Sequence, residues 1–488
     1  MIASRTPSFF KDRYVLSFLI GGIGVALTSM RYSIQPLAWI AYAPLLAPLF
    51  IEGGKKRHLW LLAIVLIAIH VVVAKIVTPP VTYIMLPMFA LPISLIVFVT
   101  IAGAAWTYRV LGVRWGIYLL PALAVTFEWL QYSFSDQSTW GALAFTQTQN
   151  LSLMQFTSLF GIAGVSFLVG LGSSLAAAVA VEGWYPLRSD VTAFLIVVLA
   201  AHFYGEVRLQ HDAPGTPIRI AAVASPFAVE ETRPMFMNPD LARGMDAKLW
   251  SRTSQAADLG AKVIVWNEAA TMMRRDDELA FVEAGKALAA RKQIDLVMAY
   301  GVLLSADPPQ FENKYLWIRA DGSIADEYWK RHPVPGEGSI RGKKAAQVIA
   351  FPEGKISGAI CYDYDFPEIS LAHVRSGAGL TVLPSSDWRG IDPLHSDMAR
   401  FMGVAAGISV VRSVRSATSF ASDPYGRLKG AMRFYEPGPG VMIADVSAVS
   451  VPTLYAWTGD VLPWITAAFS LFALAATARR RRRPGGNG

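Results

Sequence analysis

The chain has 488 residues, of which 53% are hydrophobic, and a formal net charge of +8. Its mean hydropathy of +0.38 excludes an ordinary water-soluble enzyme, and its length allows at least two domains. The single cysteine, Cys361, excludes a disulfide within the chain.

Apolar residues are concentrated in the first ~210 residues and the last ~30. A helix of about 20 apolar residues can cross a bilayer, so the sequence predicts eight transmembrane helices. The first window is not a cleaved signal peptide, because another apolar window follows it directly. The windows are 14–31, 35–52, 59–78, 83–108, 115–133, 157–182, 190–208 and 461–478.

Lys and Arg residues orient the predicted spans. They gather before the first span, after the second, after the fourth and after the last. The loops after the third and fifth spans, residues 79–82 and 134–156, contain no Lys or Arg. Since cytoplasmic loops are rich in Lys and Arg, we expect both termini in the cytoplasm and the segment between spans seven and eight outside it. This pattern explains most of the positive charge and argues against a nucleic-acid partner.

Residues ~213–452 have the composition of a soluble domain. "IRIAAVA", "AKVIVW" and "IDLVMAYGVLL" predict buried strands, with a helix expected over 238–259. Asp321-Gly322 and Glu353-Gly354 lie between β-branched runs, which indicates two hairpins. We therefore expect a transmembrane domain at 1–212, a layered αββα domain at 213–452, and a C-terminal span with a basic tail at 453–488.

Three chemically reactive residues follow apolar strands in this domain. Glu268 follows "VIVW", Lys330 follows "DEYW" and Cys361 follows "ISGAI". The carboxyl ends of strands are where α/β sites are usually built. The expected chemistry is attack by a cysteine thiolate, for which Glu268 and Lys330 are the candidate partners.

The surroundings of Cys361 favour a reactive thiol. Pro367 can begin a helix, capped by Asp365 or Phe366. A helix N-terminus and a neighbouring ammonium both lower a thiol pKa, so we expect a lowered pKa here.

Other residues compete for these roles. His332 is an alternative base, although a local hydrogen-bonding role fits it better, and His395 falls in a less defined loop. Lys314 competes with Lys330. Cys361 could also be an inert core thiol. Glu128 lies inside a predicted span, where a carboxylate is costly, and it lines a cavity or lies near the interface.

Three motifs in order carry a resemblance to a known family. "WNEA", "YWKRHPVPGEG" and "AICYDYDFPE" resemble the signature segments of the nitrilase (carbon–nitrogen hydrolase) superfamily, and "LPSSDWRG" and "SDPYGR" resemble its later segments. Together with the predicted spans, and with "PLAWIAYAPLL" in the membrane part, the whole chain resembles the bacterial apolipoprotein N-acyltransferases. The resemblance implies an α-helical membrane bundle of about eight helices plus an α/β nitrilase-type αββα sandwich.

The resemblance implies a Glu–Lys–Cys triad. Cys361 would attack the ester carbonyl of a phospholipid and hold the acyl chain as a thioester. Glu268 would be the general base, and Lys330 would stabilise the oxyanion with the backbone N–H of Tyr362.

Further residues and partners follow from the same resemblance. Glu337 matches a second acidic residue that positions the lysine, and Tyr362 and Asp363 match the pair after the nucleophile, where the family usually has Glu instead of Asp363. The acceptor would be the α-amino group of a diacylglyceryl-cysteine on an apolipoprotein. The implied site is extracytoplasmic, at the bacterial inner membrane. Residues 225–250 are expected to form a gate that dips into lipid. No metal-ligand spacing or phosphate loop occurs, and the transfer requires no cofactor.

Some segments depart from the family pattern and keep alternatives open. The Gln-x-Asn segment expected after the first strand is missing, Glu337 comes one residue early, and "FMGVAAG" lacks an expected acidic residue. These departures concern acceptor recognition more than the nucleophile. The alternatives are a membrane-anchored amide hydrolase, an acyltransferase with another acceptor, and a transporter or scaffold whose nitrilase-like domain is inactive.

Overall fold

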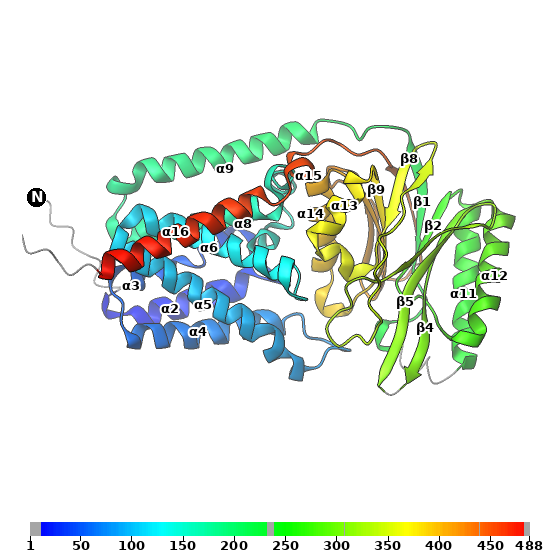
Figure 1. The fold of residues 1–488 in the computed structure, drawn as a ribbon, viewed down its shortest axis with the longest axis horizontal. Helices are drawn as coiled ribbons and strands as arrows, with labels where there is room; N and C mark the ends of the chain where they lie inside the picture. Colours follow the sequence, from blue (N-terminus) through cyan, green and yellow to red (C-terminus); the bar gives the residue numbers. More distant parts are fainter. Residues whose placement is uncertain (1–10, 232–238, 307, 439, 483–488) are drawn as a thin grey trace, which may run out of the picture. The chain divides into compact units, whose positions relative to one another are not determined.

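The computed structural model describes residues 11–231, 239–306, 308–438 and 440–482 (Figure 1). The chain forms two compact units. One comprises Met1–Val77, Val81–Val207 and Thr458–Gly488, and the other comprises Thr78–Pro80 and Arg208–Trp457. We call them the helical unit and the α/β unit.

The helical unit consists of helices joined by short loops (Figure 1). Several one-turn 3₁₀ helices lie between the longer ones. Its elements are α2 (Tyr14–Thr28), η1 (Gln35–Trp39), α3 (Ala43–Ile51), α4 (Lys55–Ala74), η2 (Tyr83–Met85), α5 (Leu86–Leu111), α6 (Val113–Phe134), η3 (Leu143–Gln147), α7 (Leu151–Met154), α8 (Thr157–Glu182), η4 (Tyr185–Leu187), α9 (Arg188–Leu209) and α16 (Val461–Arg482).

All eight apolar windows contain helix, but eight membrane spans are not found. Within the described residues, five helical segments are long and apolar enough to cross a membrane: Lys55–Ala74, Tyr83–Leu111, Thr157–Glu182, Tyr185–Leu209 and Val461–Arg482. The first two windows form shorter pieces, because 29–34 breaks the helix and the second window is divided between η1 and α3. Helix α6 carries Arg114, Glu128 and Gln131 and is not among the five.

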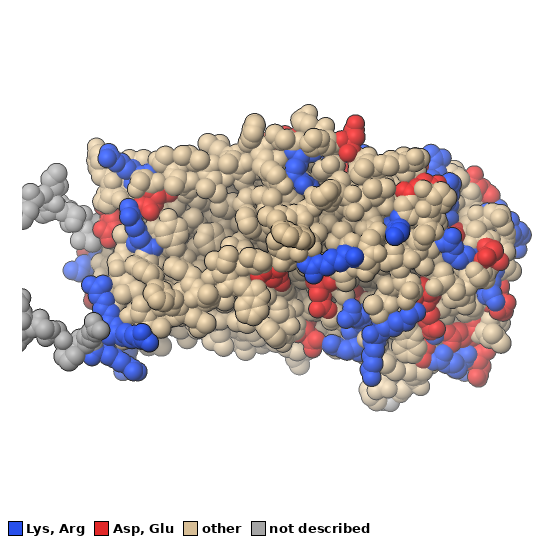
Figure 2. Space-filling view, turned by 45° about the horizontal axis from the view of Figure 1, so that its top comes forward, with Lys and Arg blue, Asp and Glu red and all other residues tan. Residues whose placement is uncertain are grey.

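The long helices differ in how much of their surface the unit covers. The apolar window of α8 is 83% buried, whereas that of α9 is only 11% buried. Large apolar side chains of α9, such as Leu199 and Phe203, are exposed. Most of the surface of this unit in Figure 2 carries no charged side chain, and basic side chains gather at one end. An apolar outer surface of this kind matches a lipid environment.

The α/β unit contains the strands and helices expected from the sequence, with additional ones at its edges. The strands are β1 (Pro217–Val223), β2 (Val263–Trp266), β3 (Met272–Arg274), β4 (Asp295–Ala306), β5 (Pro309–Ile318), β6 (Ile324–Trp329), β7 (Ile349–Phe351), β8 (Gly354–Gly358), β9 (Leu380–Ser386), β10 (Ser409–Arg415), β11 (Thr418–Ser422), β12 (Leu428–Arg433) and β13 (Val441–Ser447). The helices and short turns are η5 (Val229–Glu231), α11 (Pro239–Asp258), α12 (Arg275–Lys292), η6 (Cys361–Asp365), α13 (Pro367–Arg375), η7 (Arg389–Ile391), α14 (Leu394–Ala406) and α15 (Leu454–Thr458).

The strands form two sheets packed between two layers of helices. One sheet has the order β13-β1-β2-β4-β5-β6, with β3 beside β4, and the other has the order β12-β11-β10-β9-β8-β7. Helices α11 and α12 cover the outer face of the first sheet, and α13 and α14 cover that of the second (Figure 1). The order of layers is therefore αββα.

The central strands are buried on both faces. All four residues of β2 and the last four of β1 are buried, as expected for parallel strands enclosed by two layers. β2 runs parallel to β1 and β4, and β9 runs parallel to β8 and β10. Parallel neighbours end at the same sheet edge, so residues that follow them are brought together.

Candidate active site

Glu268, Lys330 and Cys361 each follow a strand of the α/β unit. Glu268 comes two residues after β2, Lys330 directly follows β6, and Cys361 begins the short turn η6 after β8. The exposed fractions of these residues are 4%, 1% and 4%. Their burial is unusual for a carboxylate and an ammonium, which are almost never fully buried unless they are paired.

Lys330 is held between two carboxylates. Its Nζ lies 2.7 Å from Glu268 Oε1 and 2.6 Å from Glu337 Oε2. Asn313, on β5, donates from its Nδ2 to both glutamates, at 2.7 and 2.9 Å. Burial opposes the charge on Lys330, but attraction by Glu268 and Glu337 raises its pKa well above the usual value. Lys330 is therefore a fixed positive charge inside the site.

Glu337 is positioned by its own chain segment. The backbone N–H of Val334 donates to Oε2 at 2.9 Å, and the hydroxyl of Ser339 donates to Oε1 at 2.8 Å. Burial disfavours the ionised form, but the ammonium of Lys330 outweighs it and lowers the pKa of Glu337. The carboxylate is thus ionised and orients Lys330.

Cys361 has a constrained backbone and a buried thiol. Its φ of +49° lies in the left-handed region, which residues with a Cβ rarely adopt. Sγ lies 3.7 Å from the carbonyl oxygen of Ser386 and 3.9 Å from Asp387 Oδ1. The turn therefore fixes the direction of the side chain.

The expected lowering of the Cys361 pKa is wrong. Burial, followed by the negative charge of Glu268, raises the thiol pKa well above its usual value, although Lys330 and Arg412 oppose this. Helix α13 does begin at Pro367, after Phe366 as the capping residue, but η6 separates it from the thiol. Cys361 is accordingly protonated at rest and requires a base.

Asp363 anchors the chain segment that follows Lys330. Its Oδ1 accepts the backbone N–H groups of Arg331 and His332, at 3.0 and 2.6 Å. Its Oδ2 accepts the hydroxyl of Tyr328 at 2.8 Å and the N–H of Ile360 at 3.2 Å. One fully buried carboxylate therefore ties the Lys330 strand end to the Cys361 strand end.

A second ionic cluster lies on the other side of the thiol. Arg412 on β10 makes two 2.9 Å bonds to the carboxylate of Asp387, and its Nη2 lies 3.9 Å from Cys361 Sγ. His395 lies 2.8 Å from Asp387 through Nδ1 and 2.9 Å from Asp365 through Nε2. Burial opposes the charge of His395, but Asp365 and Asp387 raise its pKa to about 9.

Two family profiles match this chain. The N-terminal domain of apolipoprotein N-acyltransferase matches residues 21–175, and carbon–nitrogen hydrolase matches residues 228–454. Apolipoprotein N-acyltransferase of Geobacter metallireducens is 25% identical over 520 aligned positions, which cover 98% of each chain. The chain belongs to the apolipoprotein N-acyltransferase family. It is thus an enzyme of the carbon–nitrogen hydrolase superfamily and a multi-pass membrane protein.

Other relatives match smaller parts of the chain. The apolipoprotein N-acyltransferase of Agrobacterium fabrum is 26% identical over 365 positions, 66% of each chain. The deaminated glutathione amidase of Bos taurus is 30% identical over 147 positions, covering 26% of this chain and 44% of the amidase. Among solved structures, an amidase from Nesterenkonia sp. aligns with a TM-score of 0.38 at 17% identity, over 50% of this chain and 94% of the amidase.

The residues that competed with this trio have other partners. Lys314 pairs with Glu278 and Glu312, at 2.6 and 2.8 Å. His332 stacks on Phe366 with ring centroids 4.0 Å apart and contacts Asp363 through Nδ1. His395, expected in a loop, lies instead in helix α14 and is buried.

The remaining expected site features are only partly described. Tyr362 is buried in η6 directly after the cysteine. The expected gate, residues 225–250, lies partly outside the described residues, since 232–238 are not among them. Within the described part, Phe227 is buried under the guanidinium of Arg415.

Cys361, Asp387 and His395 also have the residue types of a metal site. Their possible ligand atoms lie within 4.8 Å of one another. However, the guanidinium of Arg412 already occupies hydrogen-bonding positions on Asp387, and a positive charge there disfavours a second cation. The donor set therefore fits an ionic cluster around the thiol better than a metal centre.

Asn313, Asp387 and Arg412 were not identified as site residues from the sequence, and Asp365 was considered only as a helix cap. The signals for Asp387 were the polar "SSDW" after an apolar strand and the resemblance of "LPSSDWRG" to a later segment of the superfamily. Arg412 lies on β10, whose residues are all buried, and a buried arginine must find a partner. That requirement was a usable signal, although it does not identify the partner.

Proposed function

We propose that this family member moves a fatty acyl chain from a phospholipid to the N-terminal amine of a diacylglyceryl-modified apolipoprotein. The observation that supports it is the buried arrangement of Glu268, Lys330 and Glu337 beside a lone protonated thiol. The transfer of an acyl chain from an ester to an amine through a thioester needs no cofactor.

In the first half-reaction, Glu268 takes the proton of the Cys361 thiol as Sγ attacks the ester carbonyl carbon. The oxyanion that forms is stabilised by the ammonium of Lys330 and the backbone N–H of Tyr362. The bond between the carbonyl carbon and the ester oxygen then breaks. The proton passes from Glu268 to the departing lysophospholipid alkoxide, which leaves an acyl thioester.

In the second half-reaction, the neutral amine attacks the thioester carbonyl and Glu268 accepts a proton from it. The carbon–sulfur bond breaks, the thiolate leaves, and the proton returns to Sγ. Lys330 remains charged throughout, because two carboxylates hold its proton. Glu337 and Asp363 act as positioning residues for the lysine and for the segment after it.

The decisive experiment is the intact mass of the purified protein after incubation with phospholipid and no acceptor. We expect an added acyl mass that hydroxylamine removes, and no such mass on Cys361→Ala. An unmodified protein whose thiol still reacts with an alkylating reagent would contradict the lipid donor. Release of ammonia from small amides would instead favour an amide hydrolase, which the 30% match to an amidase keeps as the second candidate.

We further propose that the basic helix ends of the helical unit face the cytoplasm and the α/β unit lies outside it. Lys55, Lys56 and Arg479 to Arg482 support this orientation. In a Cys361→Ala background, Asp136→Cys should react with a membrane-impermeant maleimide on intact cells. Lys56→Cys should react only after the cells are opened, and the reverse pattern would overturn the orientation.

A further inference from the structure

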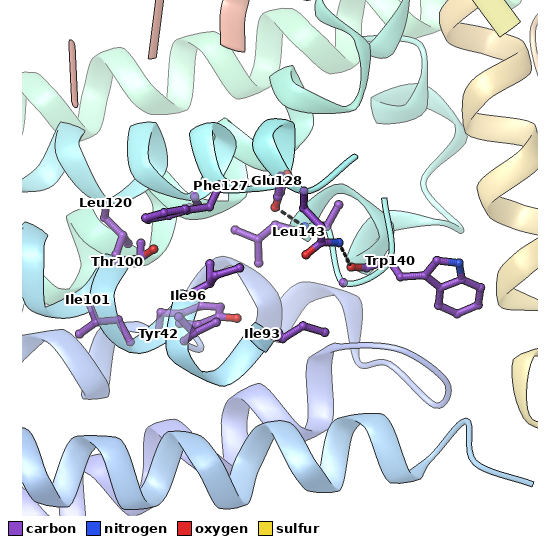
Figure 3. Close-up of a pocket in the computed structure, with 16 residues that line it drawn as sticks. Tyr42, Ile93, Ile96, Thr100, Ile101, Leu120, Phe127, Glu128, Trp140 and Leu143 are labelled. Atoms are coloured by element: carbon purple, nitrogen blue, oxygen red, sulfur yellow. Dashed lines mark hydrogen bonds between the residues drawn. The ribbon is translucent and has the colours of Figure 1, made fainter. Parts of the chain in front are cut away.

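Two buried charged side chains show how this chain satisfies such groups. In the helical unit, Glu128 lines a cavity between α5 and α6, one of the two placements expected from the sequence. Its Oε1 accepts the backbone N–H of Leu143 at 2.8 Å (Figure 3). In the α/β unit, Arg412 on β10 makes two bonds to the buried carboxylate of Asp387. A charged side chain is almost never fully buried without such a partner, so a buried charge that lacks one needs an explanation.

Arg415, the last residue of β10, is a buried arginine without an ion pair. It is 3% exposed, and no carboxylate oxygen of the described residues lies within 4.0 Å of its guanidinium. Its Nε donates to the hydroxyl of Ser386 at 2.7 Å. Its Nη1 is buried and has no hydrogen-bond partner in the described part of the chain. Because a guanidinium has five N–H donors, much of its bonding capacity is unused.

The guanidinium of Arg415 is nevertheless held in one orientation. Ser386 faces Arg415 across the parallel strands β9 and β10, and the ring centroid of Phe227 lies 5.0 Å from the guanidinium carbon. Burial lowers the pKa of Arg415 to about 10, so the group is still charged at neutral pH. A fixed and charged guanidinium with an unused nitrogen is suited to an oxyanion, which arginine binds through two parallel hydrogen bonds.

Arg415 belongs to the surroundings of the Cys361 thiol. The carbonyl oxygen of Ser386 lies 3.7 Å from Cys361 Sγ, while the hydroxyl of the same residue accepts the bond from Arg415. The backbone N–H of Glu268 donates to the carbonyl oxygen of the preceding residue, Ser385, at 3.1 Å. The charges of Glu268 and Cys361 both act on the guanidinium. An anion bound by Arg415 would therefore lie close to the reacting sulfur, as part of a substrate.

The two substrates of the proposed transfer differ in charge next to their acyl esters. Both the phospholipid donor and the diacylglyceryl acceptor carry acyl chains esterified to a glycerol, so either could present an ester carbonyl to Cys361. On that glycerol the donor carries a phosphate, whereas the acceptor carries the sulfur of its cysteine, with an amine beyond it. A positive charge beside the thiol favours the donor and repels a protonated amine. Discrimination of this kind depends on the difference between two affinities.

We propose that Arg415 binds the phosphate of the acyl donor and thereby selects the ester of the donor over the esters of the acceptor. The inference rests on the proposed function and extends it from the reacting atoms to the choice of donor. The phosphate would provide the counter-charge that is missing among the described residues, and Nη1 would gain an acceptor. After the acyl chain has moved to Cys361, the lysophospholipid carries the phosphate away, which frees the site for the uncharged diacylglyceryl group.

The test compares thioester formation from two donors that differ in the phosphocholine group alone. Purified full-length protein is mixed with phosphatidylcholine or with diacylglycerol of identical acyl chains, and the acylated fraction is followed by intact mass. The diacylglycerol stands in for the diacylglyceryl group of the acceptor. We expect phosphatidylcholine to react about 10²-fold faster, and this preference to fall to about one in Arg415→Gln.

Two further variants keep the comparison interpretable. Arg415→Lys retains the charge but loses the planar fork, so it should keep a preference of about tenfold, and it replaces the glutamine variant if that one does not fold. The matched control is Arg219→Gln. It removes an exposed arginine of the same unit that already has a carboxylate partner, Asp445. The control should keep the preference of the parent protein.

Binding without chemistry is measured in the Cys361→Ala protein. Hexadecylphosphocholine, a phosphodiester without an acyl ester, competes with the uncharged hexadecylglycerol, and retained lipid is counted by native mass spectrometry. We expect the phosphodiester to be retained about tenfold over the uncharged lipid, and this ratio to fall to about one when Arg415→Gln is added. If no lipid acylates the parent protein but this ratio and its loss are observed, the proposed transfer fails while the phosphate site stands.

Several results would overturn the phosphate site. The first is equally fast thioester formation from both donors in the parent protein. The second is an unchanged preference in Arg415→Gln with slower reaction of both donors, which would make Arg415 a distant counter-charge for Glu268. The third is a Tm of Cys361→Ala that inorganic phosphate raises only when Arg415 is present, with neither lipid preferred, which would assign the site to free phosphate. Absence of both the thioester and the retention ratio would overturn it as well.

Discussion

Glu337 lies seven residues after Lys330 in the chain, and its Oε2 is 2.6 Å from the lysine Nζ. Relative to the superfamily motif that this segment resembles, Glu337 is expected to come one residue early. The contact still forms because Val334 and Ser339 turn the carboxylate inward with two hydrogen bonds. The number of residues between Lys330 and Glu337 can thus vary while the carboxylate still reaches the lysine Nζ.

The substitution Glu337→Gln should therefore impair acyl transfer without unfolding the protein. It removes one of two negative charges that raise the pKa of Lys330, while the amide can still accept hydrogen bonds. We expect kcat to fall about 10²-fold, the effect of weakening one oxyanion donor. Steady-state transfer rates measure this, with Ser339→Ala as the control that keeps the charge. Equal rates for Glu337→Gln and the parent would exclude a role in positioning Lys330.

Substitution of Glu268 should affect acyl transfer and thiol reactivity in opposite directions. Glu268 contributes to the raised pKa of Cys361, so Glu268→Gln should lower that pKa and speed iodoacetamide alkylation at pH 7–8. Acyl transfer should fall about 10²–10⁴-fold because the general base is lost. Alkylation of Cys361 against pH, followed by mass spectrometry, measures the first effect. Slower alkylation of the variant would show that Glu268 does not act on the thiol through its charge.

The sequence predicted which residues the fold brings together better than it predicted their electrostatics. Apolar strands ending at Glu268, Lys330 and Cys361 could be recognised, because strand periodicity and position are local properties. The direction in which the pKa of Cys361 is shifted could not be predicted, because it depends on burial and on Glu268, which is 93 residues away in the chain. The Asp387–Arg412 pair joins segments 25 residues apart, and only the folded sheet reveals it. Five of the eight predicted spans lie in described helices that are long and apolar enough to cross a membrane, and hydropathy windows do not register the helix break at 29–34.

Asp363 should matter for stability as well as for activity. The substitution Asp363→Asn replaces one carboxylate oxygen by an NH₂ group. If Oδ2 is replaced, the hydroxyl of Tyr328 and the N–H of Ile360 lose their acceptor. If Oδ1 is replaced, the backbone N–H groups of Arg331 and His332 lose theirs. Whichever way the amide turns, two donors lose their acceptor, and we expect a loss of about 2–5 kcal/mol. Thermal unfolding in detergent measures it. Tyr328→Phe, which removes one bond, should lower stability by about 1 kcal/mol, and an equal loss in both variants would contradict this assignment.

His395 gives the α/β unit a pH-dependent stability. Its pKa is raised from 6.5 to about 9 in the folded state, so the folded protein binds the proton more tightly than the unfolded chain. This stabilisation is complete below about pH 6.5 and is lost as the pH rises through about 9. We expect the Tm to decline between pH 7 and 9.5, and the decline to be smaller in His395→Gln. A parallel decline in the variant would exclude His395 as its origin.

The Asp387–Arg412 pair should show strong coupling in a double-mutant cycle. Both residues are almost fully buried. Removing Asp387 takes the carboxylate from the Arg412 guanidinium, and removing Arg412 leaves Asp387 with His395 as its remaining described cation. Each change should destabilise the protein by about 3–5 kcal/mol. The double variant Asp387→Asn, Arg412→Gln should lose much less than the sum of the single variants. Chemical unfolding of the three variants gives these energies. Because Arg412 Nη2 lies 3.9 Å from Cys361 Sγ, Arg412→Gln should also raise the thiol pKa and slow alkylation at pH 8. Additive energies with unchanged alkylation would mean that the pair neither acts as a unit nor reaches the thiol.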